Sequence, residues 1–237
     1  MRILVWGTLF LMGWPCVAAD CLQFKKIPGV YINTPDWSKT VVQSHEQMNL
    51  WHGNVVATLV DNYQINADVN PVDGGYCVGL KYVNCVVGYS DFVVHIDIRH
   101  QPNSCAYNVI LNHEDMHIKT YLSVIDDFKG DLQRAVYSAA QSVMPRFVKS
   151  RDDIDDIINV MNSELQSHPE LILIKQKIAA AQEIRNKKID DVLKNMKYMI
   201  IKKGGYMLEI PLTETLPSVG TRIALKCLAR VDLPLPL

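Results

Sequence analysis

The chain has 237 residues, with 24 Lys and Arg against 25 Asp and Glu, so its formal net charge is −1. Without a basic excess, it is not expected to bind nucleic acid or an anionic membrane surface through charge. Its length is sufficient for one large domain or two small ones.

The first 19 residues have the pattern of a signal peptide. Arg2 supplies a positive charge, residues 3–13 are apolar, and residues 17–19 (Val-Ala-Ala) form a small-residue cleavage site. The apolar run is too short to span a bilayer. We therefore expect cleavage after Ala19 and a secreted or periplasmic protein, with no membrane contact once the signal is removed.

An exported chain favours disulfide bonds between its cysteines. Cleavage after Ala19 would leave five of them: Cys21, Cys77, Cys85, Cys105 and Cys227. We expect two bridges and one remaining thiol, because five is an odd number. A bridge from Cys105 would anchor the start of a helix, and the pairing of the others stays open.

The region after the signal combines a predicted short helix with predicted strands. Residues 38–52 have the pattern of a helix that Gly53 ends. Residues 55–98 are rich in β-forming side chains. Two turn signals interrupt them, Asn70-Pro71 and the Asp-Gly-Gly sequence at residues 73–75.

Residues 92–98 give the clearest strand pattern in the chain. Apolar and polar side chains alternate there with a period of two. His95 and Asp97 fall on the same face of this strand. They would either face solvent or support a site on the next element.

The following residues are predicted to be mainly helical. A helix is expected from about residue 104 to 142, capped by Asn103 or Ser104 and ended before Pro145. A second helix covers about residues 152–165. Pro169 then suits the first turn of a helix that continues to about Lys203.

These elements predict an α+β fold in a single domain over residues 20–237. A small N-terminal sheet would pack on the helix of residues 104–142 within an α/β part, residues 20–145. A long antiparallel helical hairpin would follow as an arm, residues 146–203. Residues 204–237, rich in β-formers and proline, would form a short β segment at the C-terminal end.

Residues 113–117 read His-Glu-Asp-Met-His, an H-E-x-x-H motif inside the first long helix. Histidines four residues apart lie about 40° apart around the helix axis and about 6 Å apart along it, so both imidazoles can reach one metal ion. Glu114 lies beside the first of them, where it can take a proton from metal-bound water. Otherwise, the motif belongs to an amphipathic helix whose histidines are surface or satisfied core residues.

This motif, following the strand of residues 92–98, resembles that of the zincin metallopeptidases and, more loosely, of uncharacterised bacterial secreted zinc-dependent proteases. The resemblance covers about residues 90–125. It implies that His113 and His117 bind one zinc ion per chain. It also implies that Glu114 activates a zinc-bound water, which hydrolyses a peptide bond of a protein or peptide substrate. The glycine and third histidine typical of metzincins do not follow His117.

A hydrolytic zinc site usually has three protein ligands and one open position. Asp127 and Asp131 point within about 60° of the histidine side of the same helix. However, they lie about 15 and 21 Å farther along its axis, which is too far for a straight helix to bring them to the metal.

A helix later in the chain can supply the third ligand instead. If two antiparallel helices meet at a turn near residues 147–148, Glu183 lies level with His113. Neighbouring helices pack about 8–10 Å apart, a gap that two ligands and a metal can bridge. We therefore predict Glu183 as the third ligand, with Glu164 and Glu170 as alternatives.

Two other functions fit parts of the sequence. Residues 151–203 mix apolar positions with many charges, as in a helical bundle or coiled-coil partner. The chain could thus be a non-enzymatic exported module that binds a partner protein through its helical hairpin, with a structural or vestigial metal site. It could also be a zinc-dependent amidase that acts on peptide bonds of the cell wall.

Overall fold

The structure is a computed structural model that describes residues 20–45 and 53–202. Its elements, in chain order, are η1 (Asp20–Phe24), β1 (Gly29–Asn33), β2 (Ser38–Ser44), β3 (Gly53–Val72), β4 (Gly75–Asp97), α1 (Cys105–Ser142), β5 (Arg146–Val148), η2 (Arg151–Asp153), α2 (Ile154–Gln166) and α3 (Pro169–Lys202). Within these ranges, no helix is both long and apolar enough to cross a membrane. The predicted signal peptide and the predicted C-terminal β segment lie outside the described residues.

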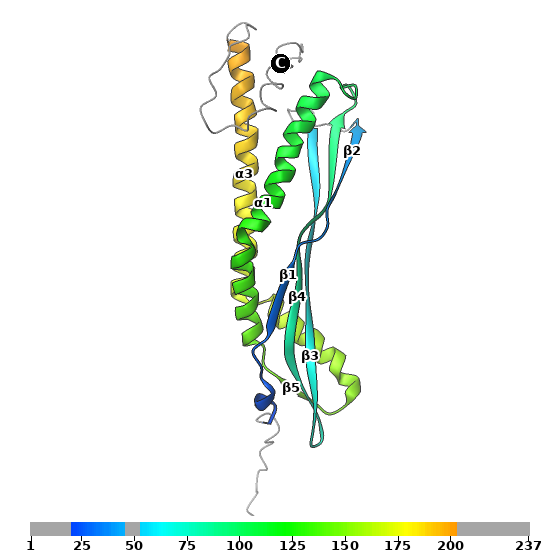
Figure 1. Cartoon of the computed structure of the whole chain (residues 1–237), viewed down its shortest axis with the longest axis vertical. Coiled ribbons are helices and arrows are strands. Elements are labelled where there is room, and N and C mark those ends of the chain that lie inside the picture. The colour runs from blue at the N-terminus through cyan, green and yellow to red at the C-terminus, as the bar shows by residue number, and fades with distance from the viewer. Residues whose placement is uncertain (1–19, 46–52, 203–237) are drawn as a thin grey trace, which may run out of the picture.

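β4 is the strand with which every other described strand pairs (Figure 1). β3 runs antiparallel to it along its length, and the turn between them falls at residues 73–74, as predicted. Gly74 has a φ of +76°, a conformation that glycine adopts without steric cost. The other edge of β4 is shared by β5, which is antiparallel, and by β1 and β2, which are parallel.

Two shifts in the register between β3 and β4 keep one face of β4 buried. They fall between Thr58 and Leu59 and between Asn66 and Ala67. At each shift β4 contains one extra residue, so the alternation of its side chains reverses. The buried residues of β4 accordingly change from even to odd numbers and back to even: Phe92, Val94 and Ile96, then Val83, Cys85 and Val87, then Val78 and Leu80.

α1 packs across this buried face of the sheet. Its first half places Ile110 and Ile118 against the even-numbered residues near the end of β4. Its second half forms a larger core with the middle and start of β4, with α2 and with the first turns of α3. The N-cap of α1 is Ser104, as predicted, and its hydroxyl accepts a hydrogen bond from the backbone N–H of Tyr107.

Two local predictions are wrong. In place of a helix beginning at residue 38, the chain forms β2, in which Thr40, Val41 and Val42 are β-branched and favour a strand. Residues 46–52 of that predicted helix lie outside the described residues. The predicted turn at Asn70-Pro71 lies inside β3, where Pro71 pairs with Tyr76. Proline is tolerated there because β3 is an edge strand of the described sheet.

The protein is a mixed α and β structure, as predicted, but its sheet is not small. The described residues form a sheet of five strands, of which β3 contains 20 residues and β4 contains 23. The antiparallel partner of α1 is α3, which begins at Pro169 as predicted (Figure 1). β5 and α2 separate these two helices in the sequence, and α2 packs mainly against β3.

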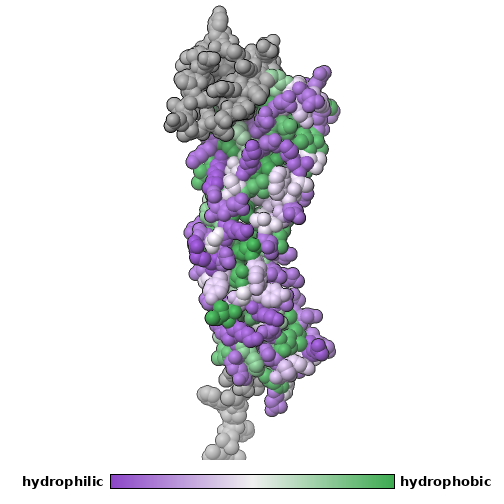
Figure 2. Space-filling model, in the orientation of Figure 1, coloured by the Kyte–Doolittle hydropathy of each residue, from purple (hydrophilic) through white to green (hydrophobic). Residues whose placement is uncertain are grey.

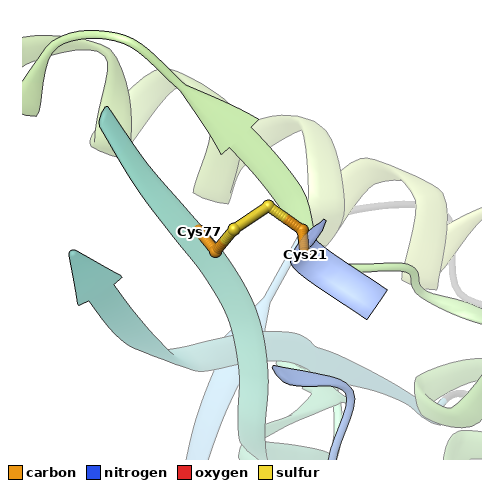
Figure 3. Close-up of a disulfide and its surroundings, with 2 residues drawn as sticks. All are labelled: Cys21 and Cys77. Carbon is orange, nitrogen blue, oxygen red and sulfur yellow. A yellow bond between two sulfur atoms is a disulfide. The ribbon is translucent and has the colours of Figure 1, made fainter. Parts of the chain in front are cut away.

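A disulfide between Cys21 and Cys77 joins η1 to β4 (Figure 3). Cys105 at the start of α1 is also disulfide-bonded, in agreement with its predicted role. Cys85 is a buried free thiol, and burial raises its pKa to about 12. The structure therefore contains disulfide bonds, as the cysteine pattern predicted. Cys227 lies outside the described residues.

Replacing Cys21 and Cys77 together with Ser should lower the free energy of unfolding by about 2–4 kcal/mol, because the bridge restricts the unfolded chain. Urea denaturation of the double variant beside the original chain measures this difference. The exposed neighbour Gln23, changed to Ser, is the control and should leave the midpoint unchanged. Equal stabilities of all three proteins would contradict a stabilising role for the bridge.

Candidate metal centre

Three side chains from two helices meet at one point. His113 and His117 of α1 place their Nε2 atoms 3.1 Å apart. Each of these nitrogens lies 3.3 Å from Oδ1 of Asp190 on α3. The side chains of the two histidines are 3% and 10% exposed, and that of Asp190 is 36% exposed. The two histidines are therefore shielded from solvent, whereas Asp190 is partly exposed.

These distances are close to the separations of ligand atoms around a bound metal ion. A tetrahedral zinc ion with ligands at about 2.0–2.1 Å separates its ligand atoms by about 3.3–3.4 Å. The three separations in the structure are 3.1, 3.3 and 3.3 Å. His113, His117 and Asp190 thus form a candidate metal site.

Asn186 of α3 orients the second histidine. Its Oδ1 lies 3.0 Å from Nδ1 of His117. An amide oxygen can only accept a hydrogen bond, so Nδ1 of His117 carries the proton and Nε2 directs its lone pair at the candidate site. Burial and, next, the charge of His117 lower the pKa of His113 to about 4, while Asp190 opposes this shift. His113 is therefore neutral near pH 7, the form that binds a metal.

Glu114 lies beside the histidines and is almost completely buried, with 2% of its surface exposed. Its Oε1 has no hydrogen-bond partner among the described residues. Burial and, next, the negative charges of Asp190 and Asp115 raise the pKa of Glu114 to about 8. A buried carboxyl oxygen without a partner is costly, and such groups often have a functional role.

The structure does not bring Glu183 to the histidines. Glu183 is exposed on α3, and Asp190 lies about two helical turns farther along the same helix. The predicted register assumed that the helices meet near residues 147–148. In fact α1 ends at Ser142, and the intervening β5 and α2 change the level at which α3 meets α1.

The alternative carboxylates also have other places in the structure. Glu164 forms an ion pair with Arg146, and Glu170 is exposed in the first turn of α3. Asp127 lies 2.7 Å from Arg185, and it therefore helps to hold α3 against α1. None of them lies among the three residues of the candidate site.

A signal for Asp190 was present in the sequence. Asn186 and Asp190 are four residues apart, so they share one side of α3 just as His113 and His117 share one side of α1. Metal sites inside helical bundles are built from such side chains on facing helices.

Two other residues considered in the sequence do not support the site. Val94 and Ile96 contact α1, so His95 and Asp97 of the same strand point to the opposite face of the sheet. They cannot contact the histidines of α1 from there. Tyr121 of α1 packs its ring against Tyr89, with centroids 4.8 Å apart.

Replacement of Asp190 by Asn should remove most of the bound metal, because a negative ligand becomes neutral. The matched replacement of Glu183 by Gln on the same helix should leave metal content at the level of the original chain. Elemental analysis of the purified proteins after zinc reconstitution compares the two directly. Metal loss in the Glu183 variant alone would show that α3 docks in the register predicted from the sequence.

Replacement of Asn186 by Leu should weaken metal binding about 10–100-fold, because His117 loses the acceptor that fixes its tautomer. Competition with a chromophoric chelator measures the dissociation constant. The adjacent exposed residue Lys187, changed to Leu, is the control and should bind metal as the original chain does. An unchanged affinity in the Asn186 variant would show that His117 needs no such support.

Comparisons with known proteins assign no family to the chain. It matches no protein-family model, no curated protein and no solved structure. The chemistry of this site is therefore inferred from its own side chains and their geometry.

Proposed function

We propose that this protein is an exported zinc-dependent hydrolase that cleaves peptide bonds. The observation that carries the proposal is the group of His113, His117 and Asp190 at spacings close to tetrahedral, together with the buried carboxyl group of Glu114, the residue that follows His113. The disulfides of the chain are consistent with export.

The ligand set favours zinc over the other common divalent ions. Two imidazoles and one carboxylate suit zinc, whereas calcium and magnesium prefer oxygen ligands throughout. Two histidines and a carboxylate with one open position are also a known catalytic combination. Here the described residues supply three ligands, and the partly exposed Asp190 leaves a route from solvent. When bound, zinc would polarise a substrate carbonyl and acidify a coordinated water.

Glu114 is the residue to which we assign proton transfer. It would accept the proton of the attacking water and deliver it to the leaving amine of the substrate. Its Oε1 is free of competing hydrogen bonds within the described part of the chain. Its raised pKa of about 8 belongs to the metal-free site, and a bound zinc ion would lower this pKa so that the carboxylate could accept the proton. Asn186 would hold His117 in its metal-binding tautomer, and Arg185 would fasten α3 to α1 through Asp127.

The outer edge of β3 supports a peptide as the substrate. β3 begins at Gly53 next to Glu114, and its outer edge pairs with no other described strand. An edge strand offers backbone donors and acceptors to an extended peptide. A peptide bound there would pass close to the carboxyl group that moves the proton.

A second candidate function is partner binding through the helices, as the sequence also allowed. It is supported by exposed apolar residues of α3, among them Ile172, Leu173 and Ile184. On the face drawn in Figure 2, however, apolar residues form small areas separated by polar ones. Docking also does not require two buried histidines aimed at a carboxylate, so hydrolysis accounts for more of the structure.

Replacement of Glu114 by Gln should retain one zinc per chain and reduce kcat about 10²–10⁴-fold, because the amide cannot accept the proton. Elemental analysis and cleavage of a peptide library measure the two effects. The exposed Glu170, changed to Gln, is the control and should change neither. Full turnover in the Glu114 variant would rule out the assigned mechanism.

A further inference from the structure

Gly53, the first residue of β3, lies directly against the carboxyl group of Glu114. A Cβ atom at this position would be 2.8 Å from Oε1 of Glu114 and 3.3 Å from its Cγ. The same atom would be only 2.4 Å from Cγ2 of Ile110. All three separations are shorter than ordinary van der Waals contact, and two are below 3.0 Å, so any residue other than glycine would displace a neighbour.

The backbone itself does not require glycine at this position. Among the described glycines, Gly74 and Gly88 have positive φ values, and Gly53 does not. Gly53 pairs with Ile96 in the regular antiparallel ladder. Glycine is therefore required by the close approach of α1, because the side chains of Ile110 and Glu114 occupy the space that a Cβ atom would need.

We propose that Gly53 is a positioning residue for Glu114. Its bare backbone leaves a space in which the carboxyl group lies between α1 and β3, buried and free of hydrogen bonds to described residues. The proposal rests on the function proposed above, because it assigns a second residue to the same proton transfer. The proposal also means that the start of β3 fixes the position of the Glu114 carboxyl group, although β3 contributes no functional side chain there.

The two neighbours of a new methyl group would respond differently. Ile110 is 7% exposed and packs with Phe92, Val94 and Ile96, so its movement is restricted. Oε1 of Glu114 is the end of a flexible side chain, which can rotate away. The carboxyl group should therefore yield first. A displacement of about 1 Å at a reacting group can reduce the rate about 100-fold.

The test compares Gly53→Ala with Gly29→Ala in the full zinc-loaded chain. Gly29 is also in a strand, and a Cβ atom there would have its nearest neighbours at an ordinary 3.4 Å. We expect one zinc per chain in both variants. We also expect kcat to fall about 100-fold in Gly53→Ala with little change in KM, and neither to change in Gly29→Ala. Unchanged kcat in Gly53→Ala would overturn the proposal.

Ile110→Ala separates displacement of Glu114 from simple overpacking. In the Gly53→Ala background it removes the shorter of the two contacts. It leaves the contact with Glu114, so kcat should stay low. If kcat returned to the original value, the loss would come from packing and Gly53 would not position Glu114.

Crystal structures of the zinc-loaded original chain and of Gly53→Ala give a readout that does not depend on activity. We expect the Glu114 carboxyl group to move in the variant, while His113, His117 and Asp190 stay in place. If the original chain binds zinc but cleaves no peptide, the proposed function fails, and these structures still decide the role of Gly53. An unmoved carboxyl group would overturn it.

Discussion

The hydrogen-bonded ladder along β4 is the constraint on which the rest of the structure depends. The four other strands of the described residues all pair with this one strand, and its two extra residues keep apolar side chains on a single face over its length. α1 lies on that face and buries Ile110 and Ile118 there. Because this side of α1 packs on the sheet, the histidines of the motif point toward α3 and Glu114 points toward the start of β3.

The contact between α1 and α3 changes character along its length. Near the start of α3, Leu171, Ile174 and Ile178 are buried in the main core. Farther along, the contacts are polar, as with Asn186 and Asp190 against the histidines. The apolar part supplies the free energy that places α3, because apolar burial is worth more than exposed ion pairs. The polar part contains the candidate ligands, of which Asp190 is partly exposed.

The parts of the structure that depend only on residues close in the sequence could be predicted from the sequence. The cap at Ser104, the start of α3 at Pro169 and the spacing of the motif all have short-range physical causes. The strand at residues 38–44 was missed, because its β-branched residues matter only once β4 is beside them. Asp190 was missed because its level against α1 depends on the intervening β5 and α2, which no local pattern measures.

The candidate site is divided between the middle of one helix and the far part of another, with β5 and α2 between them in the sequence. During synthesis, the two histidines therefore emerge well before Asp190. A partly made chain contains two of the three candidate ligands, and the third is synthesised only after the first turns of α3, which pack in the main core. If the candidate site binds a metal, tight binding would therefore require completed folding, and a bound ion would identify chains whose helices have docked in the correct register.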